Sequence, residues 1–212
     1  MNPDKLIDCI NESCKNSVNP AFNLKPYRIF YNSRHYIIEG TSYAVNRFDI
    51  PQESVKVLNW FNDFWLFFEI RFIAEYKKNK RKNITDIIIR ISLSVFQGKD
   101  NDNEKHQLFR AEWDDNNDSD EKHAQPHWHI TSSQAIENIF YNYADTFDKD
   151  DFLQLLEDEK NKVLDVKKIH FAMNGDWNNN KHVHKIENEQ QIVKWLQGLL
   201  SHLRTELEAL IK

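Results

Sequence analysis

The sequence predicts an α+β fold in which several helices pack against a largely antiparallel sheet. Residues 27–50 and 85–114 are rich in β-branched and aromatic side chains and largely alternate with polar ones, as half-buried strands do. Residues 55–76 and 187–211 instead repeat apolar side chains at three- and four-residue steps, the spacing of one helical face. The chain has no internal repeat and only four glycines, so we expect one domain over residues 1–212.

The first expected elements are a helix and a group of strands. Residues 3–15 place apolar side chains at helical spacing and predict a short amphipathic helix. Residues 27–50 are rich in Tyr, Ile and Val, and they predict two or three strands with a turn near Glu39–Gly40.

Residues 55–76 predict a long, aromatic-rich central helix. The preceding "PQES" is typical of a helix start. The apolar side chains that would share one helical face are Val57, Phe61, Phe64, Trp65, Phe68, Phe72 and Ile73. Four charged residues interrupt the segment, and a charge near the centre of a membrane-spanning helix costs roughly 2.5–3.5 kcal/mol. We therefore expect a helix buried within the protein and no contact with a membrane.

A run of five cations, "YKKNKRKN", follows at residues 76–83. One interpretation is the solvated end of the central helix, where cations complement the helix dipole. The other is a patch that binds phosphate groups.

The C-terminal half combines strands and helices. Residues 85–97 and 105–114 predict a hairpin around a polar loop, and residues 126–131 predict a short strand. The pattern then becomes helical after Ser132, a suitable N-cap. The remaining expected elements are helices over 132–147 and 148–162, a strand over 166–173, and a long amphipathic C-terminal helix over 187–211.

The composition excludes several classes of protein. A net charge of −5 gives no overall attraction to nucleic acid, so any contact with phosphate needs a local basic patch. The two cysteines, Cys9 and Cys14, fall in one expected helix and are poorly placed to pair. The N-terminus lacks a basic segment followed by an apolar run, so we expect no signal peptide and a cytoplasmic location. P-loop, Rossmann and nucleophile-elbow motifs are absent from the sequence.

Ionisable side chains alternate along two of the expected strands. Residues two apart in a strand point to the same face. Arg110, Glu112 and Asp114 therefore share one face of their strand, and His127 and His129 share one face of theirs. If the two strands are neighbours, these groups converge into a common hollow. An ordinary solvated sheet face is the alternative, because antiparallel sheets often expose one face to water.

One use of such a cluster is metal-independent acid–base catalysis. Imidazole titrates near neutrality, so His127 and His129 are candidates for general base and general acid. Arg110 would stabilise a phosphate or a developing oxyanion, with Glu112 or Asp114 as the acidic partner. His170, on the expected strand over 166–173, is a further catalytic candidate.

The other use is metal binding. Two histidines and one carboxylate suit a divalent transition metal. The candidate ligands are His127, His129 and Asp114, with Glu112 as an alternative carboxylate. The cofactor is then a divalent metal ion, whereas the acid–base mechanism needs none.

The stretch "LFRAEWDDNNDSDEKHAQPHWHI", within residues 108–130, resembles the motif of TumE-type toxins of bacterial toxin–antitoxin systems. In that motif an Arg and an aromatic–Asp–Asn element precede a His-x-His on an adjoining strand. Arg110, Asp114, His127 and His129 match these positions, whereas Glu112 and Trp113 depart from the usual arrangement. The resemblance implies a toxin or defence factor directed at nucleic acid.

Three functions therefore compete at the level of sequence. The first, which the sequence favours, is a metal-independent phosphodiesterase or ribonuclease-like enzyme that acts on nucleic acid or a nucleotide. The second is a non-enzymatic interaction subunit of a defence or toxin–antitoxin complex, which binds a protein partner through an apolar surface. The third is a metal-dependent hydrolase. Burial of Trp60, Trp65 and Trp195 favours the enzymes, whereas a large exposed apolar patch favours the subunit.

Overall fold

The computed structural model describes residues 2–47, 51–79, 82–103, 105–116, 125–130 and 185–211. Eight strands and two helices lie in these residues. In chain order they are α1 (Pro3–Ser17), β1 (Leu24–Phe30), β2 (Ser33–Ile38), β3 (Ser42–Asn46), β4 (Glu53–Phe61), β5 (Phe64–Asn79), β6 (Lys82–Gln97), β7 (His106–Asp114), β8 (His127–Ile130) and α4 (Glu189–Leu210).

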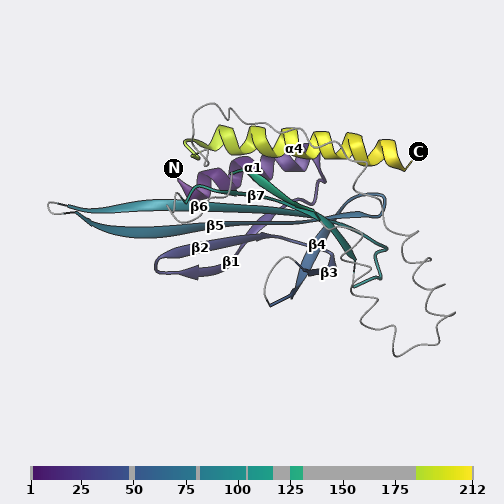
Figure 1. Ribbon diagram of the computed structural model, residues 1–212, viewed down its shortest axis with the longest axis horizontal. Coiled ribbons are helices and arrows are strands. Elements are labelled where there is room, and N and C mark those ends of the chain that lie inside the picture. The colour runs from purple at the N-terminus through teal and green to yellow at the C-terminus, as the bar shows by residue number, and fades with distance from the viewer. Residues whose placement is uncertain are drawn as a thin grey trace.

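The strands form an antiparallel sheet whose main path runs β1-β2-β5-β6-β7-β8, while β4 pairs with β5 and β3 pairs with β4. Helices α1 and α4 lie together along one face of this sheet (Figure 1). The buried stripe of α4 comprises Ile192, Leu196, Leu199, Leu200, Leu203 and Leu207. It belongs to the same hydrophobic core as the buried residues of α1 and of the sheet. Neither helix of the described residues is long and apolar enough to span a membrane.

Both helices begin where local hydrogen bonding satisfies their first N–H groups. The side chain of Asn2 accepts hydrogen bonds from the backbone N–H groups of Asp4 and Lys5 at the start of α1. Helix α4 begins with a capping box, in which Asn188 and Gln191 each accept a hydrogen bond from the other's backbone N–H. The expected N-terminal and C-terminal helices are thus confirmed.

The expected central helix over 55–76 is wrong. The segment forms strands β4 and β5, which are joined at Asn62–Asp63, and Asn62 adopts a positive φ of 46°. The reason is that β5 is apolar on both faces: Leu66 and Phe68 are buried on one face, and Trp65 and Phe67 on the other. A strand buried on both sides has no polar alternation, and its continuous apolar run resembles the pattern of a helix.

The expectation of several helices packed on the sheet is wrong as well, because the described part of the chain holds only α1 and α4 beside eight strands. The helices expected over 132–147 and 148–162 and the strand expected over 166–173 lie outside the described residues. The other expected strands are confirmed: β1, β2 and β3 fall within or next to 27–50, and β6, β7 and β8 match the expected hairpin and short strand.

The pairing of β7 with β8 positions the ionisable face of the sheet. Arg110 lies opposite His129, and Glu112 lies opposite His127. Trp113, which follows Glu112 in β7, points to the other face, where its ring lies 5.5 Å from the ring of Trp195 on α4. The ionisable side chains of β7 therefore lie on the face of the sheet that α4 does not cover.

Candidate functional site

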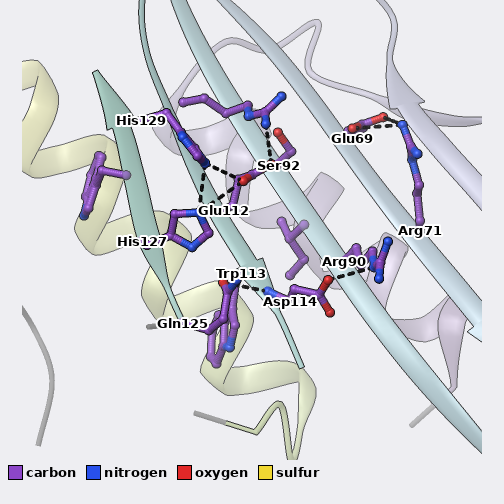
Figure 2. Close-up of a pocket in the computed structure, with 13 residues that line it drawn as sticks. Glu69, Arg71, Arg90, Ser92, Glu112, Trp113, Asp114, Gln125, His127 and His129 are labelled. Atoms are coloured by element: carbon purple, nitrogen blue, oxygen red, sulfur yellow. Dashed lines mark hydrogen bonds and ion pairs between the residues drawn. The ribbon is translucent and has the colours of Figure 1, made fainter. Parts of the chain in front are cut away.

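Glu112, His127 and His129 converge on one point at the β7–β8 pair. Figure 2 shows both imidazoles directed toward the carboxylate of Glu112. Glu112 Oε2 lies 2.8 Å from His129 Nε2 and 3.3 Å from His127 Nε2, and the two Nε2 atoms lie 2.8 Å apart. The three side chains are half-buried, so each keeps part of its surface exposed for contact with a ligand.

Arg110 supports this cluster from the next position of the same face. Its Nη2 lies 3.0 Å from Glu112 Oε1, and the residue is buried. Burial alone would raise the pKa of Glu112, but hydrogen bonding to His127 and His129 and the charge of Arg110 outweigh burial and lower the pKa to about 2. Glu112 is therefore a carboxylate anion at neutral pH, and its second oxygen remains directed at the histidines.

The cluster forms one wall of a cavity of about 490 Å³, a volume typical of small-molecule sites. Three guanidinium groups, three carboxylates and two imidazoles line it: Arg71, Arg90, Arg110, Glu69, Glu112, Asp114, His127 and His129. Such a concentration of charge on a sheet that is otherwise rich in apolar residues indicates a site for a polar, charged ligand.

Each guanidinium group in the cavity is paired with a carboxylate. Arg71 Nη2 lies 2.9 Å from Glu69 Oε2, and Arg90 Nε lies 2.7 Å from Asp114 Oδ2. Arg71 and Arg90 lie opposite each other across β5 and β6. Their side chains are 47% and 45% exposed, so both retain surface for contact with an anionic ligand.

Glu69 is held by a third histidine, His35. Its Oε2 lies 2.8 Å from Nε2 of His35 on β2. Burial raises the pKa of Glu69, but the hydrogen bond with His35 and the charge of Arg71 give a net lowering. This side of the cavity therefore presents an ionised carboxylate that fixes the position of Arg71.

The structure brings five of the six predicted site residues to one cavity, namely Arg110, Glu112, Asp114, His127 and His129. His170 lies outside the described residues. Asp114, an expected metal ligand, is instead paired with Arg90, and its backbone N–H donates to the side chain of Gln125. Glu112 is the carboxylate that faces the histidines.

The sequence prediction missed Glu69, Arg71 and Arg90. The first two were assigned to a helix, where residues two apart do not share a face. In a strand they do, and Glu69 and Arg71 stand as isolated charges two apart in an apolar run. That spacing was the available signal.

The donor set fits a divalent transition metal. Three ligand atoms, from Glu112, His127 and His129, lie within 4.8 Å of one another. A tetrahedral zinc ion with metal–ligand bonds of about 2.0–2.2 Å requires ligand atoms ~3.3 Å apart. The observed separations of 2.8–3.3 Å reach this value with shifts of about half an ångström. Two histidines and one carboxylate leave further coordination positions for water or substrate.

Comparison of the chain with protein-family models, curated proteins and solved structures gives no match. The resemblance to TumE-type toxins therefore stays a prediction from the motif within residues 108–130.

Proposed function

We propose that the protein is a divalent-metal-dependent hydrolase of phosphodiesters. The observation that carries this proposal is the convergence of Glu112 Oε2 and the Nε2 atoms of His127 and His129 beside a cavity lined by arginines. Glu112, His127 and His129 are the metal ligands in this proposal. Arg71 and Arg90 bind the phosphate group, since guanidinium groups form paired hydrogen bonds with phosphate oxygens.

The same geometry argues against the metal-independent mechanism that the sequence favours. In that mechanism a general base and a general acid act on the attacking and leaving oxygens, which lie roughly in line on opposite sides of the phosphorus. The imidazole nitrogens here lie 2.8 Å apart and share one carboxylate oxygen. They are therefore placed to bind one ion rather than the two ends of a substrate.

In this proposal, some residues of the site position the metal ligands and others position the arginines that bind the substrate. A metal ion held by Glu112, His127 and His129 would act as a Lewis acid that polarises a phosphoryl oxygen and activates water. Arg110 fixes Glu112 through the oxygen that does not face the histidines, and so orients the ligand. Asp114 and Glu69 orient Arg90 and Arg71 through their ion pairs.

Burial of three tryptophans was the criterion for choosing between an enzyme and an interaction subunit, and these tryptophans are mostly buried. Trp60 and Trp65 are buried, and Trp195 packs partly buried against the core. Exposed apolar side chains do gather at the β1–β2 hairpin, where Tyr27, Ile29, Phe30 and Tyr31 are each more than half exposed. This hairpin is the surface that supports the second candidate function, binding of a protein partner.

The test is hydrolysis of bis(p-nitrophenyl) phosphate and of single-stranded RNA and DNA by purified protein. The protein is stripped with a chelator and then supplied with Zn²⁺, Mn²⁺ or Mg²⁺. We expect activity only after metal is restored, and we expect at least a hundredfold loss of kcat in the variants His129→Ala and Glu112→Gln. His202→Ala on α4 is the matched control and should retain activity.

Full activity in the presence of the chelator would contradict the metal requirement and restore the acid–base mechanism. Absence of hydrolysis with every metal and substrate would contradict the enzymatic proposal. The toxin or defence role that the TumE-type motif implies is tested separately, by growth arrest on expression of the wild-type chain and its absence with His129→Ala.

A further inference from the structure

A row of basic side chains crosses the sheet on the face that holds the cavity. Residues directly opposite each other in an antiparallel pair point to the same face. From β1 to β6 the opposed residues of this row are Arg28, His35, Arg71 and Arg90, and Asp114 of β7 follows them. The row begins on β1, the first strand of the main path, and ends beside the cavity wall that Glu112 forms. It therefore connects β1 with the proposed metal ligands.

A β-bulge adds an aromatic side chain to the β1 end of the row. The register of β1 against β2 shifts between Pro26 and Arg28, so Tyr27 and Arg28 both face His35. The rings of Tyr27 and His35 lie 5.3 Å apart in an edge-to-face arrangement. The Cζ atom of Arg28 lies 4.9 Å from the centre of the Tyr27 ring, and Arg28 Nη2 donates to Tyr27 Oη at 3.3 Å. These two residues form one unit, the Tyr27–Arg28 pair.

Direct contacts join the Tyr27–Arg28 pair to the cavity. His35, whose ring meets that of Tyr27, has its Nε2 atom 2.8 Å from Glu69 Oε2. Glu69 in turn forms an ion pair with Arg71 (Figure 2). Both Glu69 and Arg71 line the cavity. A ligand that leaves the cavity along this row therefore reaches the Tyr27–Arg28 pair.

The outer surface of the row is positive, although carboxylates lie within it. The side chains of Arg71 and Arg90 are 47% and 45% exposed, whereas those of their partners Glu69 and Asp114 are 13% and 18% exposed. The guanidinium groups therefore lie outside the carboxylates and meet an incoming ligand first. Arg28 is exposed, and within the described part of the chain no carboxylate pairs with it. Since the net charge of the chain is −5, this row is a local basic patch of the kind that contact with nucleic acid requires.

The basic run over residues 76–83 is not part of this row. The expected helix end is wrong, because residues 76–79 end β5 and residues 82–83 begin β6. The side chains of the run lie outside the described residues, so a phosphate-binding patch there stays a prediction.

The Tyr27–Arg28 pair lies too far from the metal ligands for a small substrate to contact both. Neighbouring strands lie about 4.8 Å apart. Along the path β1-β2-β5-β6-β7, Glu112 is four steps from Arg28, which is about 19 Å. A nucleic acid strand advances about 3.4 Å per stacked nucleotide, so about six nucleotides span this distance. Only a polymer therefore uses the metal ligands and the Tyr27–Arg28 pair at the same time.

We propose that the Tyr27–Arg28 pair is a subsite for a single-stranded nucleic acid that crosses β6, β5, β2 and β1 with its scissile phosphate at the metal ligands. The inference rests on the proposed phosphodiesterase function and names its substrate as a polymer. Arg28 binds a backbone phosphate, and an unpaired base stacks on the ring of Tyr27, which is 51% exposed. Neither contact reads a base edge, so affinity and kcat/KM depend on the length of the strand and not on its sequence.

Fluorescence anisotropy in the presence of chelator measures binding without cleavage. The probes are labelled single strands of about 12 and about 3 nucleotides, as RNA and as DNA, at about 100 mM salt. Wild type should bind the longer strand at least tenfold more tightly than the shorter one. Tyr27→Ala/Arg28→Gln should lose at least tenfold in affinity for the longer strand. In Arg28→Gln alone, the slope of log K against log [salt] should fall in magnitude by about 0.7, the value for one phosphate of a single strand.

Three variants control for stacking, for the fold of β1 and for net charge, and each should bind the longer strand within threefold of wild type. Tyr27→Phe keeps the aromatic ring. Ile29→Thr changes the opposite face of β1, because Ile29 lies opposite Arg34, whose guanidinium group donates to Asp4 of α1. Lys15→Gln removes one positive charge from an exposed position on α1.

Equal binding of the longer strand by wild type and by Tyr27→Ala/Arg28→Gln would overturn the proposal. An equal loss of affinity in Ile29→Thr or Lys15→Gln would also overturn it, because the effect would then come from the fold of the β1–β2 hairpin or from net charge. Failure of wild type to bind either polymer would overturn it as well, and would leave the exposed hairpin as a surface for a protein partner.

The catalytic readout separates this inference from the proposed function. In Tyr27→Ala/Arg28→Gln, the ratio of kcat/KM on the longer strand to kcat/KM on bis(p-nitrophenyl) phosphate should fall at least tenfold. Binding of the longer strand that this variant loses, without hydrolysis of any substrate by wild type, would uphold the subsite and contradict the enzyme. Hydrolysis of both substrates with an unchanged ratio in the variant would uphold the enzyme and overturn the subsite.

Discussion

The carboxylate of Glu112 is expected to stabilise the metal-free protein strongly at neutral pH, and Glu112→Gln removes that stabilisation. The pKa of Glu112 falls from 4.5 to about 2 in the folded protein, because the interactions with His127, His129 and Arg110 outweigh the opposing effect of burial. A lowering of this size corresponds to about 3 kcal/mol. Since the folded-state pKa is the lower one, the stabilisation is fully present above pH 4.5. It is lost as the pH falls toward 2.

Urea unfolding in the presence of chelator measures this contribution. Wild type and Glu112→Gln are compared at pH 7, 5 and 3, and the difference in the free energy of unfolding is taken at each pH. We expect the difference to be about 3 kcal/mol at pH 7 and pH 5 and to shrink at pH 3. A difference that is below 1 kcal/mol at pH 7, or that does not change with pH, would show that the carboxylate does not lie among these cationic and donor groups.

Three further predictions concern single residues. Lys105 is fully buried, and its Nζ donates to Ser42 Oγ and to backbone carbonyls. Lys105→Met leaves these acceptors without a donor and should lower the free energy of unfolding by about 3 kcal/mol. A loss below 1 kcal/mol in urea unfolding would contradict this account of the ammonium group. Asn62 has a positive φ, a backbone conformation that strains a β-branched residue but not glycine. Asn62→Val should therefore destabilise the protein by about 1–2 kcal/mol in thermal unfolding, whereas Asn62→Gly should not. Equal stability of the two variants would refute the argument. Arg90→Gln should raise KM for bis(p-nitrophenyl) phosphate by about tenfold with a smaller effect on kcat, because its exposed guanidinium group binds the phosphate; an unchanged KM in steady-state kinetics would remove Arg90 from the substrate site.

The sequence predicts most of the strands but misses β4 and β5, and β5 contributes Glu69 and Arg71 to the cavity. Trp65, Leu66, Phe67 and Phe68 are all buried, so the period of two that marks a half-exposed strand is absent there. The aromatic run also satisfies helical spacing, and periodicity alone does not separate the two structures. A helix over residues 55–76 does not place Arg71 beside the histidine strands, so the prediction leaves Arg71 out of the histidine site.

The histidine cluster is predictable because residues 109–114 of β7 and 127–130 of β8 alternate apolar with ionisable side chains. A period of two places Arg110, Glu112 and Asp114 on one face whatever their partners are. It does not say which carboxylate lies level with the histidines. That choice depends on register: Glu112 lies opposite His127, whereas Asp114 lies opposite Arg90 on the other neighbouring strand. Register is set by packing of the whole sheet, so the sequence left both carboxylates open as ligands.

The central claim is that Glu112, His127 and His129 bind one divalent metal ion. Isothermal titration of chelator-stripped protein with Zn²⁺ tests it most directly, in wild type, Glu112→Gln, His129→Ala and Asp114→Asn. The account predicts one ion per chain in wild type, at least a tenfold loss of affinity in Glu112→Gln and His129→Ala, and binding close to wild type in Asp114→Asn, whose carboxylate is paired with Arg90. Zinc binding that persists unchanged in Glu112→Gln and His129→Ala would contradict it.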